Sequence, residues 1–140
     1  MNPAQFLIDT SALVLFMRTD AEHFGWDQAA TAGLIAICPI TELEFVYSTR
    51  SLADRLQAVE DLRALFSWSP VDDHAYERAW EVQEALTARG QHRTAGAVDL
   101  IVAATAELQG LTLLHRDHDF DTVAAITGQA VQWYGSPSDT

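Results

Sequence analysis

The sequence predicts an α/β fold, a three-layer α/β/α sandwich with a mostly parallel sheet of about five strands. Short apolar runs alternate along the chain with stretches of helical spacing, which is the pattern of parallel strands joined by crossover helices. The 140 residues suit one domain, and no linker, repeat or low-complexity tract interrupts them. We therefore expect a single domain over residues 1–135 and a short C-terminal tail over 136–140.

Each expected strand is a short apolar run with a recognisable end. The first run stops at Asp9 and the second at Pro39. Pro70 places the third run at a sheet edge, because proline cannot donate a ladder hydrogen bond. The fourth run is expected to be a central strand. In chain order the runs cover residues 6–8, 34–38, 68–71, 111–114 and 131–134.

The expected helices have apolar residues three or four positions apart. Two of them are followed by a glycine, Gly90 and Gly110. Glycine is common at this position because it readily takes the left-handed conformation that closes a helix. A polar loop over 91–96 separates these two helices. In chain order the helices cover residues 11–17, 21–32, a helix from near 41, 52–66, 73–88, 98–108 and 120–127.

The composition is that of an acidic protein without lysine. Eight arginines stand against twenty acids, which gives a formal net charge of −12. Nucleic-acid-binding proteins usually carry a basic face, so composition alone argues against RNA as a ligand. The charge can belong to an ordinary acidic surface, or it can indicate that several acids are metal ligands and that basic partners are favoured.

Two features favour a cytoplasmic protein. Cys38 is the single cysteine and cannot form an internal disulfide, so we interpret it as a core residue in a reducing compartment. The N-terminus lacks the basic region of a secretory signal, and no apolar run reaches the roughly 18–20 residues of a membrane span. We expect no membrane association.

Four acids occupy the ends of strands or the starts of helices. Asp9 ends the first strand, and Glu44 lies in the first turn of the helix after the second. Asp117 follows the fourth strand, and Asp99 opens an otherwise apolar helix. Ligands of open parallel sheets bind at the carboxyl ends of the strands. We therefore expect these four carboxylates to converge at one edge of the sheet.

Such a cluster needs a cation or protons, because neighbouring carboxylates repel one another. An all-oxygen set suits Mg²⁺ or Mn²⁺, which keep water ligands and leave positions for a phosphate group. A bound ion of this kind lowers the pKa of a water, orients it and stabilises the leaving oxygen. The pattern predicts phosphodiester hydrolysis without a nucleophile from the protein.

Each acid also has a purely structural interpretation. Asp9 can cap the helix that follows it, and Thr41 with Glu44 fits a T-x-x-E capping box. Asp99 can interact with a helix dipole, although an isolated acid on so apolar a helix is costly to bury. The acidic run 117–121 can be a solvated loop. These alternatives stay open at the level of sequence.

The acids stand within four stretches that occur in a recognisable order and extend over most of the chain. The stretches are LIDTSAL (7–13), ITELEFVY (40–47), AVDLIVAA (97–104) and LHRDHDF (114–120). They are similar to the motifs of the PIN domains, and within that family to the VapC-type toxins. The resemblance implies a sheet flanked by helices, a Mg²⁺ or Mn²⁺ cofactor and an endoribonuclease. It also implies the toxin of a type II (VapBC-type) toxin–antitoxin system, inhibited by a small VapB-like antitoxin, and a homodimer.

The resemblance assigns roles to individual residues. Ser11 matches a hydroxyl that steadies the first acid, and Ser48 departs from the glycine that the family often has there. Whether Asp117 or Asp119 is the fourth acid stays open. The catalytic acids are Asp9, Glu44, Asp99 and Asp117. The metal ligands are Asp9, Asp99, Asp117 and Asp119.

Other residues have weaker signals. Arg93, Arg116 and Arg50 are candidates to bind RNA phosphates, and each can equally form a surface ion pair. His115 and His118 flank Asp117 and raise zinc as an alternative metal.

The tryptophans Trp68, Trp80 and Trp133 are expected to pack in the core rather than to stack on bases. The helix that carries Trp80, Val82 and Leu86 is a candidate partner groove.

Two rival functions remain. An aspartyl-phosphate enzyme or receiver domain would match at Asp9, but the phosphatases carry a second acid where this chain has Ser11, and both classes need a lysine. The other rival is a non-catalytic PIN-like module that binds RNA or an antitoxin. Which RNA is cut does not follow from the sequence.

Overall fold

The structure is a computed structural model that describes residues 3–18 and 25–136. Within these residues one sheet has the strand order β3-β2-β1-β4-β5, and all neighbouring strands are parallel. The α/β fold with a parallel sheet is therefore confirmed. The strands are β1 Phe6–Ile8, β2 Ile35–Ile37, β3 Ser67–Trp68, β4 Thr112–His115 and β5 Val131–Trp133.

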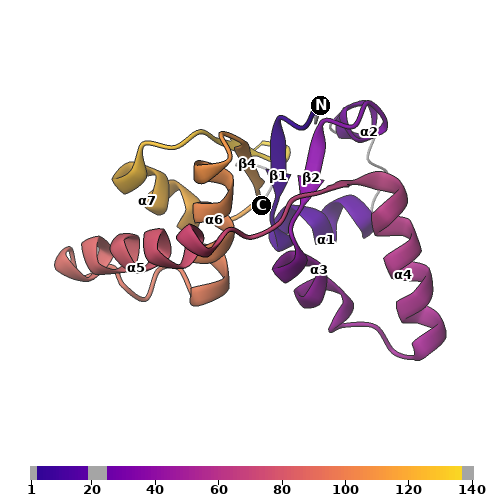
Figure 1. Ribbon diagram of the computed structural model, residues 1–140, viewed down its shortest axis with the longest axis horizontal. Helices are drawn as coiled ribbons and strands as arrows, with labels where there is room; N and C mark the ends of the chain where they lie inside the picture. The colour runs from indigo at the N-terminus through magenta and orange to yellow at the C-terminus, as the bar shows by residue number, and fades with distance from the viewer. Residues whose placement is uncertain (1–2, 19–24, 137–140) are drawn as a thin grey trace.

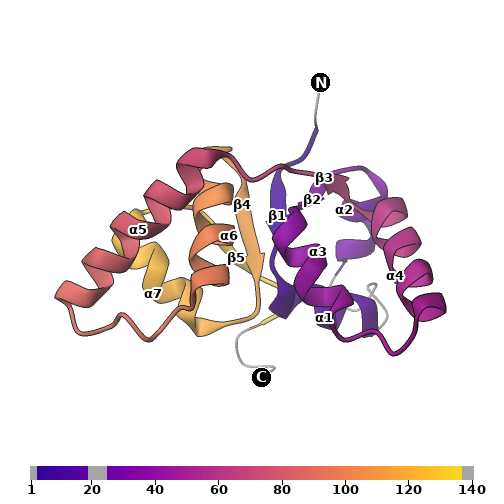
Figure 2. The same ribbon diagram turned by 60° about the horizontal axis from the view of Figure 1, so that its bottom comes forward.

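Helices cover both faces of this sheet (Figure 1). A layer formed by α5, α6 and α7 lies on one side, and α1, α2 and α4 lie on the other, as the turned view also shows (Figure 2). None of the described helices combines the length and the apolar character needed to cross a bilayer. The helices are α1 Thr10–Arg18, α2 Trp26–Thr31, α3 Pro39–Val46, α4 Leu52–Leu65, α5 Asp73–Ala88, α6 Ala97–Leu108 and α7 His118–Thr127.

The three layers follow from the alternation of side chains along the strands. Leu7 of β1 and Leu113 of β4 belong to the hydrophobic cluster that includes α5, α6 and α7. Their neighbours Ile8 and Leu114 point to the opposite face and join a cluster with α1, α2 and α4. All four side chains are fully buried, so each face of the sheet has its own core.

Open parallel sheets have a crevice where the strand order changes direction, and in this sheet that position lies between β1 and β4. The chain places β2 and β3 on one side of β1 and then returns to the other side with β4 and β5. Ile8 at the end of β1 pairs with Leu114 in β4, so Asp9 and Arg116 both leave the sheet at its carboxyl edge. Ligands of open α/β sheets bind at such a change of direction. The crevice is therefore the place where function is expected.

Several element boundaries differ from those expected. The edge strand β3 ends at Trp68 rather than at residue 71, because the Ser69 amide makes the last bond to β2 (2.9 Å to the Ile37 carbonyl) and Pro70 has no N–H. The fourth strand lies inside the sheet, between β1 and β5, as expected. Of the expected helix 21–32, residues 21–24 lie outside the described residues.

Two tryptophans expected in the core are exposed. Trp68 is 53% exposed and Trp80 is 72% exposed, whereas Trp133 is half-buried against His115. Trp80 is exposed because α5 packs in the core through another face. That face consists of alanines and aliphatic residues and includes Val82 and Leu86. Val82 and Leu86 therefore belong to the core rather than to a partner groove.

Candidate active site

Asp9 lies buried at the corner between β1 and α1. The Ser11 hydroxyl donates to its carboxylate, 2.7 Å from Oδ1 and 2.9 Å from Oδ2. The Ala12 amide donates to Oδ1 at 3.1 Å, so the capping contact considered from the sequence exists. Burial raises the pKa of Asp9 to about 6 in spite of these bonds, and the charge of Asp99 adds to the increase. Capping alone therefore does not account for this costly acid.

Ser11 connects the two strands that border the crevice. Besides donating to Asp9, its Oγ accepts a hydrogen bond from the Arg116 backbone amide at 2.8 Å. Arg116 directly follows β4, so one hydroxyl fixes the carboxylate of the first strand relative to the end of the fourth. This position agrees with the supporting role expected for Ser11.

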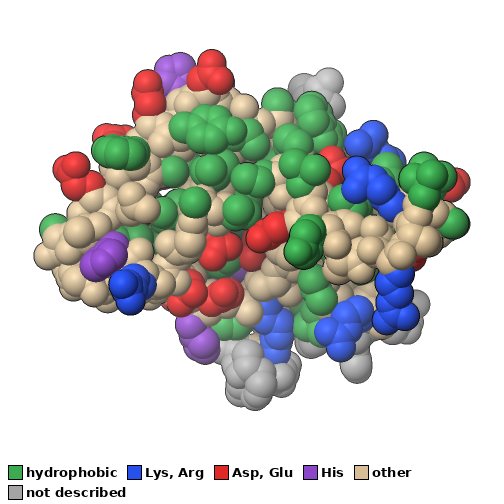
Figure 3. All heavy atoms as spheres, turned by 90° about the horizontal axis from the view of Figure 1, so that it is seen from below, with side chains coloured by type: hydrophobic (Ala, Val, Ile, Leu, Met, Phe, Trp, Pro, Cys, Tyr) green, Lys and Arg blue, Asp and Glu red, His purple; other side chains and the backbone are tan. Residues whose placement is uncertain are grey.

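The electrostatics of Asp99 indicate that the other acids are close to it. Asp99 lies in the first turn of α6 and is half-buried. Burial is the largest cause that raises its pKa to about 6, followed by the charges of Asp117, Glu44 and Asp119. Because charge interactions weaken with distance, these contributions indicate that acids of α3 and of the start of α7 lie near Asp99. Acidic side chains gather accordingly near the middle of the carboxyl edge of the sheet (Figure 3).

Glu44 is exposed on α3, and the Thr10 hydroxyl donates to its Oε1. The capping-box interpretation is wrong, because α3 begins at Pro39 and its N-cap is Cys38. Thr41 is consequently inside the helix, buried against the Cys38 sulfur. Proline is favoured at the first position of a helix, which explains the earlier start. The contact between Thr10 and Glu44 was not predicted from the sequence. The only sign of it in the sequence is that Thr10 directly follows Asp9.

Asp117 and Asp119 share the start of α7. The Asp117 side chain caps the helix by accepting from the Asp119 amide at 2.9 Å. Burial and then the neighbouring Asp117 raise the pKa of the Asp119 carboxyl. Both carboxyl groups interact with Asp99, so the structure keeps both as candidates for the fourth acid.

The arginines predicted to bind RNA differ in their surroundings. The Arg116 guanidinium donates to the Tyr134 carbonyl at 2.6 Å and to the Ser136 carbonyl at 3.2 Å, so it holds the chain after β5. Arg93 lies exposed in the loop before α6, and Arg50 is exposed before α4. Arg116 is therefore engaged within the protein, while the other two remain open to solvent.

The two histidines do not form a zinc site with Asp117. His115 is fully buried, its Nδ1 accepts from the Asp117 amide at 3.1 Å, and burial lowers its pKa. His118 is exposed and packs on Trp133 with ring centres 4.7 Å apart. Among the described residues, no three His, Cys, Asp or Glu side chains lie close enough together to hold a metal ion as they stand. A tetrahedral zinc site needs such a group, whereas Mg²⁺ is usually held by one or two carboxylates and several waters.

Comparison with known proteins agrees with this arrangement. The PIN domain family model matches residues 6–126. Ribonuclease VapC21 of Mycobacterium tuberculosis is 45% identical over 105 residues, which is 75% of this chain and 76% of that protein. Ribonuclease VapC2 of Mycobacterium tuberculosis is 41% identical over 138 residues and covers 94% of both chains.

A solved structure has the same fold. DNA-bound VapBC from Salmonella typhimurium superposes with a TM-score of 0.77 and 19% identity, over 94% of this chain and 98% of that chain. The family model extends over the first four strands of the sheet and over all of the acids described above. The chain therefore belongs to the PIN-domain family and, within it, to the VapC ribonucleases.

Proposed function

We propose that the chain is an endoribonuclease dependent on Mg²⁺ or Mn²⁺, and that it acts as the toxin of a VapBC-type toxin–antitoxin pair. The observation that supports the metal-dependent part is the raised pKa of Asp99, for which burial is the largest cause and to which the charges of acids from separate segments add. Uncompensated carboxylates in one crevice are costly, and a divalent cation relieves that cost.

The donor set is suitable for a hard divalent ion. Asp9 and Asp99 supply carboxylate oxygens that are partly withdrawn from water, and both have pKa values raised to about 6. Asp117 and Asp119, at the start of α7, are the candidates for a further carboxylate near this pair. The oxygen-only donors match the preference of Mg²⁺ and Mn²⁺. We propose Asp9 and Asp99 as the direct ligands.

The remaining residues orient this set. The Ser11 hydroxyl donates to the Asp9 carboxylate and so restricts its rotation. The Thr10 hydroxyl donates to Oε1 of Glu44 and orients this carboxylate, which we propose as the group that accepts a proton from water. A bound divalent ion supplies Lewis-acid polarisation of the phosphodiester and a lower pKa of water. Hydrolysis then needs no covalent intermediate on the protein.

Two observations support an antitoxin as the partner: the acidic charge of the chain and the solved structures that share its fold. Structures with this fold are described as VapBC complexes, among them the Salmonella typhimurium protein. The chain itself has a net charge of −12, and its crevice is acidic. A partner segment bearing arginine would neutralise the same carboxylates that hold the ion. Addition of such an antitoxin is expected to inhibit cleavage and to compete with Mn²⁺.

The direct test of the enzyme is incubation of the purified protein with total RNA in Mg²⁺, Mn²⁺ or EDTA. We expect discrete fragments with either metal and none with EDTA. Binding of RNA without cleavage under all three conditions would favour the alternative, a non-catalytic PIN-like module. Sequencing of the new RNA ends would then identify the substrate.

Metal affinity is expected to depend on pH. Because Asp9 and Asp99 titrate near pH 6, protons compete with the cation below that value. The Mn²⁺ affinity should be constant above about pH 7 and should fall up to about 100-fold per pH unit well below pH 6, since two protons are displaced. Calorimetric titration across this range measures the change. An affinity that does not vary between these limits would contradict the assignment of these two acids.

Removal of the Ser11 hydroxyl is expected to weaken catalysis without unfolding the protein. Ser11→Ala frees the Asp9 carboxylate to rotate, and loss of such a supporting contact typically costs about 10–100-fold in activity or metal affinity. Ser11→Thr keeps the hydroxyl and serves as the matched control. Equal activity of the wild type and Ser11→Ala would show that the hydroxyl does not orient Asp9.

A further inference from the structure

Two of the four candidate acids are held in place by hydroxyl groups of α1. The Ser11 hydroxyl donates to Asp9 at 2.7 Å, and the Thr10 hydroxyl donates to Glu44. Groups that act on a metal or a reacting atom need such support, because a misplacement of about 1 Å can lower a rate about 100-fold.

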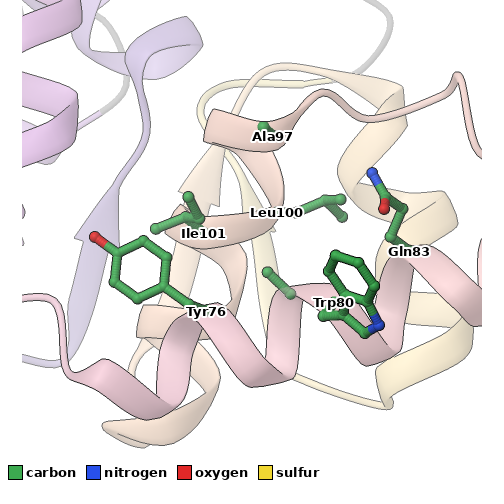
Figure 4. Close-up of a pocket in the computed structure, with 7 residues that line it drawn as sticks. Tyr76, Trp80, Gln83, Ala97, Leu100 and Ile101 are labelled. Carbon is green, nitrogen blue, oxygen red and sulfur yellow. The ribbon is translucent and has the colours of Figure 1, made fainter.

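The third acid, Asp99, is placed by the packing of α6 on α5. The two residues that follow it, Leu100 and Ile101, face α5, and Tyr76 and Trp80 of α5 project toward them (Figure 4). Leu100 is buried in the core cluster that contains residues of both helices. The first turn of α6 is therefore fixed by side-chain packing.

The fourth position, Asp117, lies in the short link between β4 and α7. Its carboxylate accepts from the Asp119 amide at 2.9 Å, which connects it to the helix. The link itself is held by side chains. The Arg116 amide donates to the Ser11 hydroxyl oxygen at 2.8 Å. The Asp117 amide donates to Nδ1 of His115, the last residue of β4, at 3.1 Å.

The ring of His115 packs against two aromatic side chains from different elements. Its centre lies 5.3 Å from the ring centre of Phe120 in α7 and 4.9 Å from that of Trp133 in β5. His115 and Phe120 are both buried. Because these contacts restrict the rotation of the imidazole, its Nδ1 is a rigid acceptor for the Asp117 amide.

The hydrogen bond also determines which ring nitrogen carries the proton. A backbone amide can only donate, so Nδ1 of His115 must accept and has no hydrogen. The proton of the neutral ring is then on Nε2, which is buried and has no hydrogen-bond partner among the residues that the structure describes. Oδ1 of Asp121 lies 3.8 Å from Nε2, which is too far for a hydrogen bond. The side chain of His115 is thus committed to the Asp117 amide.

This arrangement is costly for the fold. The two preceding positions of β4 are Leu113 and Leu114, and a further aliphatic residue would avoid the burial of a polar ring with one unpaired nitrogen. We propose that His115 is a positioning residue for the nuclease reaction, because its Nδ1 holds the Asp117 amide and so fixes the Asp117 carboxylate relative to Asp99. The inference rests on the proposed function, in which Asp117 is a catalytic acid.

A matched pair of variants separates positioning from packing. Asparagine carries Oδ1 on Cγ, where histidine carries Nδ1, so His115→Asn keeps an acceptor for the Asp117 amide. Leucine has nearly the same shape as asparagine and has no acceptor. Both variants lose the ring contacts with Phe120 and Trp133, and both should lower Tm to a similar extent.

The two variants should differ in function. His115→Leu is expected to lower kcat for RNA cleavage and the affinity for Mn²⁺ about 10–100-fold, as removal of a group that orients a metal ligand typically does. His115→Asn should keep most of both. KM should change little in either variant, because His115 is buried and does not contact RNA. The assays are made at a temperature at which circular dichroism shows both variants to be folded.

Two measurements on the metal-free protein test the contact itself. The ¹⁵N spectrum of the wild-type imidazole should show an unprotonated Nδ1 and a protonated Nε2 for His115. The Asp117 amide should exchange with solvent more slowly in the wild type and in His115→Asn than in His115→Leu.

The outcomes distinguish this role from the proposed function. A protonated Nδ1, or equal kcat and equal Mn²⁺ affinity of the two variants beside an active wild type, would overturn the positioning role and leave the nuclease intact. A wild type that neither binds Mn²⁺ nor cleaves RNA would overturn the proposed function, and the positioning role with it, even where the ¹⁵N spectrum shows the hydrogen bond.

Discussion

Asp99→Asn is expected to lower kcat/KM for RNA cleavage by about 1,000-fold or more while the protein stays folded. The substitution removes the charge of a proposed metal ligand whose pKa is raised by the charges of Asp117, Glu44 and Asp119. A metal ion contributes several kcal/mol of transition-state stabilisation, and each 1.4 kcal/mol is about tenfold in rate. Because asparagine has nearly the same shape, packing of the α6 start should not change.

Cleavage of a labelled RNA at saturating Mn²⁺ measures this loss. Asp121→Asn is the matched control, because Asp121 is an exposed acid of α7, whereas the charges that raise the pKa of Asp99 come from Asp117, Glu44 and Asp119. Both variants remove one negative charge from the same region, so a general effect of charge on RNA binding would appear in both. Equal activity of Asp99→Asn and Asp121→Asn would exclude Asp99 from catalysis.

Asp9→Asn is expected to stabilise the metal-free protein at neutral pH. Burial raises the pKa of Asp9 from 3.8 to about 6, so the folded protein holds a proton that the unfolded chain releases. For a raised carboxyl pKa, the free energy of unfolding falls as pH rises from about 4 to 6 and stays low above that range. The loss for Asp9 is about 3 kcal/mol, because one pKa unit corresponds to about 1.4 kcal/mol. Asparagine does not ionise and avoids this loss.

Urea denaturation in EDTA at pH 4 and at pH 7.5 tests the expectation. The stability difference between Asp9→Asn and the wild type should be positive at pH 7.5 and should shrink toward zero at pH 4. The side-chain carbonyl of the introduced asparagine can still accept from the Ala12 amide, so loss of the cap does not confuse the comparison. A variant less stable than the wild type at pH 7.5 would mean that the ionised carboxylate stabilises the fold.

The sheet and the meeting of the acids were predictable because both follow from short-range patterns and topology. Strands that end at Asp9 and near Asp117 reach the same edge once they are parallel and adjacent. The apolar character of the α6 sequence also identified Asp99 as an unusual acid. These features depend on the order of elements more than on any detail of packing.

Other features depend on tertiary contacts that the sequence does not contain. Arg116 is held by two carbonyl groups after β5, and nothing in its neighbourhood along the chain indicates them. Trp80 has the spacing of a core residue, yet α5 approaches α6 through small side chains and leaves the indole outside. Helix α3 begins at Pro39 rather than near residue 41, so Thr41 lies inside the helix and does not cap it.

Binding of Mn²⁺ to the purified protein, followed by electron paramagnetic resonance at pH 7.5, tests the central claim most directly. The wild type is expected to bind the ion, and a variant with both Asp9→Asn and Asp99→Asn should lose that binding while its circular dichroism spectrum stays the same. Mn²⁺ binding of equal affinity in the wild type and the double variant would show that these carboxylates do not form the metal site.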